Sequence, residues 1–290
     1  MANMPIRYSP LAILQGDDMG RHVLLTGAAG GIGQVMTAAL LADGHSVAAI
    51  DRDAAALERL AARTADARAS LHPIMADLQS ERGCETAVEA ATARFGAVDA
   101  VINNAGIGMS SIRPDAEARY PGIEELTPAI WDAFFAIFVR APVALARATV
   151  PTMRQRRWGR MVNNTTSYLT MLRVLPYGAA KAAFESLSAV WATELESSGI
   201  TVNVLVPGGP TDTPLIADAS GWPRDKMLRP AIMGPPTRWL VSDASQDFTG
   251  RRITAARWDA ALPPAEAAQR ASRAIGWPEL SADAVWLQGA

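Results

Sequence analysis

Short apolar runs alternate along the chain with longer stretches of mixed polarity, beginning at His22. The runs are mostly aliphatic and are bounded by turn-forming or polar residues, as strands buried on both faces of a sheet should be. They cover residues 22–26, 45–50, 71–77, 97–103, 160–165 and 200–206, and a seventh lies near 252–255. Between them the pattern predicts helices over 32–43, 54–65, 80–95, 129–156 and 177–198.

This alternation predicts an α/β fold, because right-handed strand–helix–strand crossovers build a parallel sheet with helices on both faces. Residues 1–20 form an N-terminal extension ahead of the first strand. Two internal segments break the rhythm: 108–128 is a long irregular link, and 208–236 is rich in proline and glycine, as a mobile substrate lid would be. Residues 258–290 form a C-terminal extension that we expect to pack on the body or on a neighbouring subunit.

Composition supports a folded, soluble protein. Of the 290 residues, 49% are hydrophobic, which is enough for a sizeable core, and the net charge is −2 with the basic residues scattered. Nucleic acid is therefore not an expected partner. The single cysteine, Cys84, excludes an internal disulfide, and no His/Cys cluster has metal-ligand spacing. The apolar run at 10–14 is too short for a membrane span, so we expect a cytoplasmic protein with no membrane partner.

The segment TGAAGGIG (26–33) follows the first strand and opens the first helix. Glycines there permit a tight turn, and helix N–H groups favour a phosphate. Asp51 ends the next strand, 24 residues after Gly27, where a carboxylate can bind an adenosine ribose. The alternative is that Asp51 caps the following helix. A ribose-binding carboxylate would repel a 2′-phosphate and favour NAD over NADP, although Arg52 next to it softens the repulsion.

Four motifs resemble those of the short-chain dehydrogenase/reductase family. They are TGAAGGIG, NNAG (103–106), YGAAK (177–181) and PGG (207–209) with the threonines that follow it. The resemblance extends from about His22 to Gly250. It implies a single Rossmann-type, doubly wound domain over residues 21–257, with about seven parallel strands flanked by helices. It also implies hydride transfer between a nicotinamide cofactor and an alcohol or carbonyl compound, in a homodimer or homotetramer.

The same resemblance implies a cofactor site. The glycine turn would hold the pyrophosphate, and Asp77 with Leu78 would contact adenine. Asn104 would stabilise the sheet beside the cofactor, the PGG segment would lie beside the nicotinamide, and either Thr211 or Thr213 would bond its carboxamide. The cofactor residues implied in this way, together with Asp51 and Arg52, are Gly27, Gly31, Ile32, Gly33, Asp77, Leu78, Asn104, Ala105, Gly106, Tyr177, Lys181, Pro207, Gly208, Thr211 and Thr213.

Tyr177 and Lys181 are four residues apart, so they share one face of a helix. A tyrosine titrates near ~10, too high for a good base at neutral pH. An ammonium at about 4 Å, at an effective dielectric of roughly 20, favours the phenolate by up to roughly 4 kcal/mol, or ~3 pKa units. We expect Tyr177 to be the catalytic acid–base group and Lys181 to assist it and to bond the nicotinamide ribose.

A third catalytic group should come from the end of the fifth strand, where the family has a serine that bonds the substrate oxygen. Thr166 and Ser167 both lie there, in a loop that is short by one or two residues. Either hydroxyl can donate to a developing alkoxide. Ser167 is favoured, because the methyl group of threonine narrows the site. Tyr168 has Leu172 where a lysine would be needed, so it is a pocket wall or a packing residue.

The chain departs from the family pattern in the segment WDAFFAIFVRAP, where Phe138 replaces an asparagine that supports a water next to the lysine. Pro142, four residues later, lacks the N–H that would bond the carbonyl of Phe138. That carbonyl would be free to hold a water. We therefore expect a relay that is kept by the backbone although the side chain has changed.

The sequence thus predicts an NAD-dependent oxidoreductase acting on a secondary alcohol or ketone, with no metal. A mostly apolar substrate is expected from the side chains that we expect to line the site: Tyr168, Leu169, Met171, Met109, Trp222 and Met227. The alternative class is a non-redox or regulatory relative that binds nucleotide, for which Phe138 is the best argument. Dehalogenase-type chemistry is a third possibility, but the glycine-rich loop and Lys181 oppose it.

Overall fold

The computed structural model describes residues 20–67 and 70–281. Of the predicted N-terminal extension it describes only residue 20, and the last nine residues lie outside the described part. Eight strands form one sheet in the order β3-β2-β1-β4-β5-β6-β7-β8. The strands are His22–Thr26 (β1), Ser46–Asp51 (β2), Leu71–Met75 (β3), Ala100–Asn103 (β4), Gly159–Asn163 (β5), Ile200–Val206 (β6), Arg251–Thr254 (β7) and Ser272–Ala274 (β8).

The first seven strands pair in parallel, so the predicted doubly wound α/β fold is confirmed. The eighth strand, β8, pairs antiparallel with β7 and was not predicted. The strand order reverses between β1 and β4, where the helices that follow these strands depart to opposite faces of the sheet. This point is where ligands bind in open α/β sheets.

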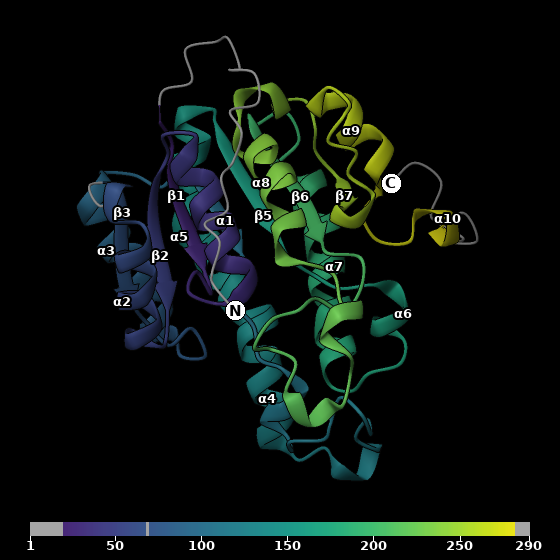
Figure 1. The fold of residues 1–290 in the computed structure, drawn as a ribbon. Helices are drawn as coiled ribbons and strands as arrows, with labels where there is room; N and C mark the ends of the chain where they lie inside the picture. The colour runs from purple at the N-terminus through teal and green to yellow at the C-terminus, as the bar shows by residue number, and fades with distance from the viewer. Residues whose placement is uncertain (1–19, 68–69, 282–290) are drawn as a thin grey trace.

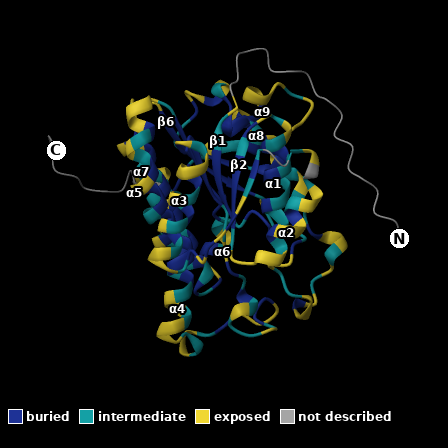
Figure 2. Cartoon of the chain, turned by 90° about the vertical axis from the view of Figure 1, so that its left-hand side faces the viewer, coloured by how far each residue is buried: buried dark blue, intermediate teal, exposed yellow. Residues whose placement is uncertain are grey.

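Helices cover both faces of the sheet (Figures 1 and 2). The α-helices are Gly31–Ala42 (α1), Ala54–Arg63 (α2), Glu81–Phe95 (α3), Pro128–Phe135 (α4), Ala141–Arg156 (α5), Tyr168–Met171 (α6), Tyr177–Glu194 (α7), Gly234–Val241 (α8), Pro264–Ala271 (α9) and Pro278–Ser281 (α10). One layer contains α3, α5 and α7, and the other contains α1, α2 and α8. Successive strand residues face the two layers in turn: Leu24 packs in the first, and Val23 and Leu25 pack in the second.

The predicted helix over 129–156 is continuous but not uniform. Between α4 and α5 the chain makes π-helical turns over Ala136–Arg140, and the N–H of Ala141 bonds the carbonyl of Ala136. Pro142 lies just beyond, where it has no N–H to restore the α-helical pattern. By length and hydropathy this helix resembles a membrane span, but its large side chains, such as Phe134 and Met153, lie in the core. It is therefore a core helix, a kind of helix that can have the same length and composition as a membrane span.

The described part of the C-terminal extension packs on the body of the same chain. After α9 the chain adds β8 to the edge of the sheet and then passes beside the start of α6, where Trp277 contacts Tyr168 with ring centroids 5.6 Å apart. Segments that are far apart in the sequence are thereby brought to the end of β5.

Candidate active site

One cleft of about 610 Å³ opens at the carboxyl edge of the sheet, at the strand-order reversal. Every predicted cofactor residue lines it, from Gly27 in the loop after β1 to Thr213 in the segment after β6. The predicted catalytic residues line the same cleft: Tyr177, Lys181, Thr166 and Ser167. The structure therefore brings together the two groups that the motifs predicted separately.

The glycine loop is shaped by close approaches that a larger residue would block. Gly27 has a φ of +62°, and a Cβ there would come within 2.7 Å of the Cα of Ala105. A Cβ on Gly31 would come within 2.6 Å of the methyl group of Thr213. The loop leads into α1, whose first turn carries no acidic side chain. Its N–H groups and helix dipole are thus suited to a phosphate.

Asp51 is held at the cleft by the backbone. Its carboxylate accepts hydrogen bonds from the N–H groups of Ala29 (3.1 Å) and Asp53 (3.2 Å). Asp53 caps α2 by accepting from the N–H of Ala56. The alternative role of Asp51 as the helix cap is therefore filled by Asp53, which leaves Asp51 as the acidic group at the end of β2, with the exposed Arg52 beside it.

Asn104 ties the end of β4 to the glycine loop. Its side-chain amide donates to the carbonyls of Thr26 (3.1 Å) and Gly27 (3.2 Å). The backbone N–H groups of Asn104 and Ala105 both donate to the hydroxyl of Thr26. These bonds fix the wall of the cleft where the chain leaves the neighbouring strands β1 and β4.

Lys181 is buried, with 4% of its surface exposed. Its ammonium donates to the carbonyl of Asn164 and lies 4.2 Å from the centre of the Phe138 ring. Burial lowers the pKa of Lys181 to about 7, although the carboxylate of Glu185 acts in the opposite direction. Phe138 thus occupies the space beside the lysine with a ring that offers a cation–π contact but no hydrogen bond.

The same ring contacts Tyr177 edge-on, with centroids 5.3 Å apart. Burial raises the pKa of Tyr177 to about 12, and a hydrogen bond from Thr166 lowers it only in part. The expectation that Lys181 brings the pKa of Tyr177 towards neutrality is therefore not met by the protein alone. The physical reason is that both groups are desolvated, and the ammonium faces Asn164 and Phe138.

The two candidate hydroxyls have different surroundings. Thr166 lines the cleft with Tyr177, and its side chain lowers the pKa of that tyrosine. Ser167 caps α6: its Oγ accepts from the N–H of Thr170 at 3.1 Å and lies 2.8 Å from the Thr170 hydroxyl. The geometry therefore favours Thr166 over Ser167 as the partner of Tyr177.

A buried ion pair that sequence reasoning missed lies behind this loop. Arg252 of β7 and Glu185 of α7 are 4% and 0% exposed and approach to 2.6 Å. Glu185 is four residues after Lys181 and so lies on the same face of α7. The spacing of Glu185 from Lys181 could have indicated that Glu185 lies near the site. Nothing in the sequence indicated that Arg252 is buried, because an arginine in a short strand is normally expected at an exposed edge.

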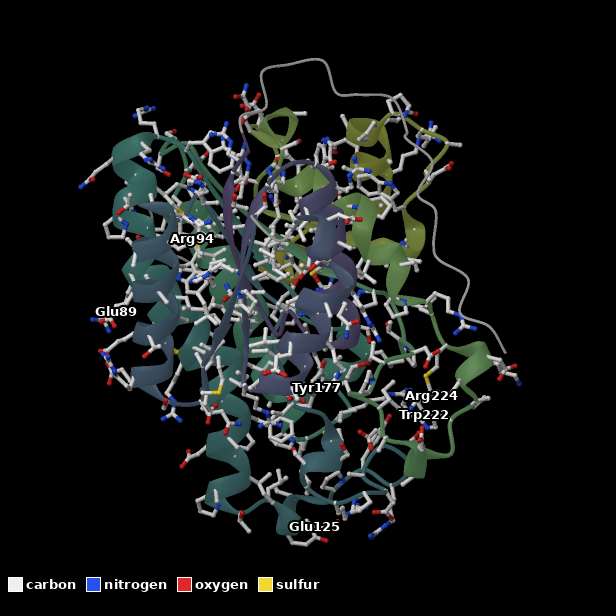
Figure 3. All side chains as sticks on the ribbon, turned by 60° about the vertical axis from the view of Figure 1, so that its left-hand side comes forward. Glu89, Arg94, Glu125, Tyr177, Trp222 and Arg224 are labelled. Atoms are coloured by element: carbon white, nitrogen blue, oxygen red, sulfur yellow. The ribbon has the colours of Figure 1, made fainter. Side chains whose placement is uncertain are left out.

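The end of the cleft away from the glycine loop is mostly apolar. Met109, Leu169 and Trp222 line it as predicted, whereas Met171 and Met227 do not. Tyr168 is also absent from the lining, because its hydroxyl donates to the carbonyl of Gly276 at 2.7 Å on the other side of the loop. Tyr168 is therefore a packing residue. Figure 3 shows Tyr177 near the foot of the sheet and Trp222 on the segment that follows β6.

One acidic side chain interrupts the apolar end. Glu117, from the predicted irregular link, lines the cleft and is 7% exposed. One carboxylate oxygen accepts from the N–H of Ser110 at 3.1 Å. The other oxygen has no hydrogen-bond partner within residues 20–67 and 70–281. No sequence pattern indicated this residue.

The segment 208–236 is held together by Arg224. Its guanidinium donates to the carboxylates of Asp212 (3.2 Å) and Asp218 (2.7 Å), and to the carbonyl of Ile216 at 2.6 Å. These bonds give the segment a defined shape over the cleft.

The described residues contain no cluster of three or more His, Cys, Asp or Glu side chains that could bind a metal ion.

Comparison with known proteins gives matches over most of the chain. A family model described as short chain dehydrogenase matches residues 21–223, which include the glycine loop and Tyr177. A D-beta-hydroxybutyrate dehydrogenase of Cupriavidus necator is 31% identical over 194 residues, covering 65% of this chain and 70% of that relative. A fluoren-9-ol dehydrogenase of Terrabacter sp. is 26% identical over 267 residues, covering 84% of this chain and 73% of that relative.

Solved structures match the fold. A 3-ketoacyl-(acyl-carrier-protein) reductase from Brucella melitensis, complexed with NADH, has a TM-score of 0.67 at 28% identity. The superposition covers 79% of this chain and 94% of that chain.

Proposed function

The chain belongs to the short-chain dehydrogenase/reductase family and is an oxidoreductase, and we propose that it transfers hydride between NAD(H) and a secondary alcohol or ketone. One observation carries the proposal. Tyr177 lies in the same cleft as Thr166, Lys181 and the glycine loop. A proton-transfer group and a nucleotide site are thus within one cavity.

The residues of the chain have separate roles in this reaction. Thr166 donates a hydrogen bond to the substrate oxygen and stabilises the alkoxide that develops on it. Tyr177 takes the hydroxyl proton as the hydride leaves carbon, or returns it during reduction. Lys181 bonds the nicotinamide ribose. A bound oxidised nicotinamide would supply the hydride acceptor, together with a positive charge that would lower the pKa of Tyr177.

The residues at the other end of the cleft fit the rest of the cofactor. The first turn of α1 suits a pyrophosphate, because Gly27 and Gly31 leave room for close approach to the backbone. The Asp51 carboxylate, held by two N–H groups, suits a ribose with free hydroxyls. We therefore favour NAD over NADP.

The substrate proposed for this site is largely apolar. Met109, Leu169 and Trp222 line the end of the cleft beyond Tyr177, and the segment 208–236 would act as the lid over it. The names of the two curated relatives, a D-beta-hydroxybutyrate dehydrogenase and a fluoren-9-ol dehydrogenase, support a secondary alcohol as the reacting group. The second name also shows that a relative acts on a ring-containing alcohol.

The proposal is tested by incubating the purified protein with a panel of secondary alcohols and ketones, with NAD(H) and NADP(H) in parallel. The absorbance of the reduced cofactor reports turnover. We expect turnover of at least one cyclic or otherwise apolar substrate, with NAD(H) preferred. Tyr177→Phe should abolish it, Thr166→Ala should reduce it by about 100-fold or more, and Ser167→Ala should reduce it much less.

The competing candidate is a relative that binds nucleotide without turnover. Phe138 favours it, since the ring beside Lys181 cannot hydrogen bond. That candidate predicts saturable binding of NAD by the wild-type protein and no oxidation or reduction anywhere in the panel. Such a result would reject hydride transfer as the function.

A further inference from the structure

The loop that carries Thr166 is anchored from behind by a buried network. One guanidinium nitrogen of Arg252 donates to the carboxylate of Glu185 at 2.6 Å and to the hydroxyl of Thr165 at 2.9 Å. The other nitrogen donates to the backbone carbonyl of Thr166. The Thr165 hydroxyl also donates to Glu185 at 2.6 Å. Arg252 therefore holds the backbone of Thr166, which lines the cleft with Tyr177.

The C-terminal segment completes the network. The hydroxyl of Tyr168 bonds the carbonyl of Gly276 at 2.7 Å and a carboxylate oxygen of Glu185 at 3.2 Å. The N–H of Gly276 also donates to Glu185, at 3.3 Å. The guanidinium of Arg252 stacks on the ring of Tyr168, 4.3 Å from its centre. Both carboxylate oxygens of Glu185 are thus occupied, as a buried charge requires.

A buried pair of this kind is not explained by stability alone, because well-packed apolar residues often stabilise a core as well as an ion pair does. Glu185 comes from α7, which carries Tyr177 and Lys181, and Arg252 comes from β7. Both bond Thr165 in the loop after β5. The network therefore joins the helix of the acid–base pair to the loop of the hydroxyl donor. The planar guanidinium of Arg252 suits this role, since its donors hold two acceptors in one fixed geometry.

We propose that Glu185 and Arg252 are positioning residues, which set the backbone of Thr166 so that its hydroxyl meets both Tyr177 and the substrate oxygen. The proposal rests on the proposed function, because it assigns a purpose to the position of Thr166. Neither residue touches the cleft, so neither is a catalytic residue. A displacement of about 1 Å at a reacting group costs about 100-fold in rate, and this is the size of effect expected.

The decisive variant removes both charges together. Glu185→Gln/Arg252→Met leaves no unpaired buried charge, so we expect a melting temperature near that of the wild type. We expect kcat to fall by about 100-fold, with the KM for cofactor changed less than about threefold. A purely structural pair predicts instead that activity follows stability. A stable double variant with kcat within about threefold of wild type would overturn the proposal.

A second variant keeps the charges. Arg252→Lys retains the ion pair, but a single ammonium cannot also hold Thr165 and the Thr166 carbonyl in the same geometry. We expect the protein to fold and kcat to fall by at least about tenfold. Wild-type kcat in this variant would also overturn the proposal. The control is the exposed pair Arg154–Glu194, at 3.0 Å on the surface: Glu194→Gln/Arg154→Met should leave kcat unchanged.

A spectroscopic readout separates failure of this inference from failure of the proposed function. The chain contains two lysines, Lys181 and the exposed Lys226, so a protein labelled with ¹³C at the lysine ε position gives two assignable signals. Lys181 donates to the carbonyl of Asn164, in the same loop as Thr166. Arg252→Lys adds a third lysine signal, which is absent from the wild-type spectrum. Of the two wild-type signals, that of Lys181 should shift and that of Lys226 should stay in place, even if the wild type turns over no substrate. An unmoved Lys181 signal would count against the positioning role.

Discussion

Raising the pH from 7 to 9 should stabilise the cofactor-free protein, because it removes a buried charge. The ammonium of Lys181 is almost fully buried and has one hydrogen bond, to the carbonyl of Asn164. Its pKa is lowered from 10.5 to about 7, chiefly by desolvation. Between these two values the unfolded chain holds the proton that the folded protein has released. The unfolded state therefore binds more protons, and the free energy of unfolding rises with pH.

The size of the effect follows from the pKa difference. At about 1.36 kcal/mol per pKa unit, the full difference corresponds to about 5 kcal/mol, of which about 2 kcal/mol falls between pH 7 and 9. Other shifted groups lie outside this window. His72 titrates below it, because its pKa is lowered from 6.5. Cys84 and Tyr177 have pKa values raised to about 11 and about 12, so their opposite contributions begin only near and above pH 9.

The assay is urea unfolding at several pH values, with the ε-¹³C signals of the two lysines followed in parallel. Lys181→Met is the matched control, since it keeps a long apolar side chain but has no titrating group. The rise of about 2 kcal/mol between pH 7 and 9 should be present in the wild type and absent from the variant. A Lys181 signal that titrates above pH 9, or an equal pH dependence in both proteins, would refute the reasoning.

Three further predictions test other parts of the site. Asp51→Ser removes the carboxylate at the ribose end of the cleft, so the ratio of NADP to NAD affinity, measured by cofactor titration, should rise by about tenfold or more; an unchanged ratio would remove Asp51 from cofactor selection. Phe138→Asn should change kcat only modestly if the backbone already supports the relay, whereas a gain of several orders of magnitude would show that the relay had been lost. Glu117→Gln keeps an acceptor for the N–H of Ser110 and removes a poorly satisfied buried charge, so the melting temperature should rise by about 2–4 °C; a clear fall would contradict this account.

The sequence predicted most of the sheet and the cleft, because those features depend on local patterns. Strands such as β6 are apolar runs that need no partner to be recognised, and its predicted limits match the structure. The glycine loop and the Tyr177–Lys181 spacing are also local, so the structure could bring them together as the motifs implied. Helix ends differ by up to four residues, as at α7, which ends at Glu194 and not near residue 198.

The features that escaped prediction depend on contacts between distant segments. Strand β8 has only three residues, and its identity as a strand comes from pairing with β7 at the edge of the sheet. Arg252 can be buried because distant residues meet it there, above all the carboxylate of Glu185, 67 residues away. The choice between Thr166 and Ser167 also depends on loop geometry that the sequence does not contain, since Arg252 holds the carbonyl of Thr166 and Ser167 caps α6.

Phe138 contributes to the burial of the acid–base pair. Its aromatic ring lies against both Tyr177 and Lys181. Desolvation favours the neutral form of each: it raises the pKa of the tyrosine and lowers that of the lysine. The pair is therefore poorly suited to proton abstraction in the protein alone, and the proposed reaction requires the charge of an oxidised cofactor to bring Tyr177 into range. A base that becomes active only when the hydride acceptor is in place would couple proton removal to the presence of the cofactor.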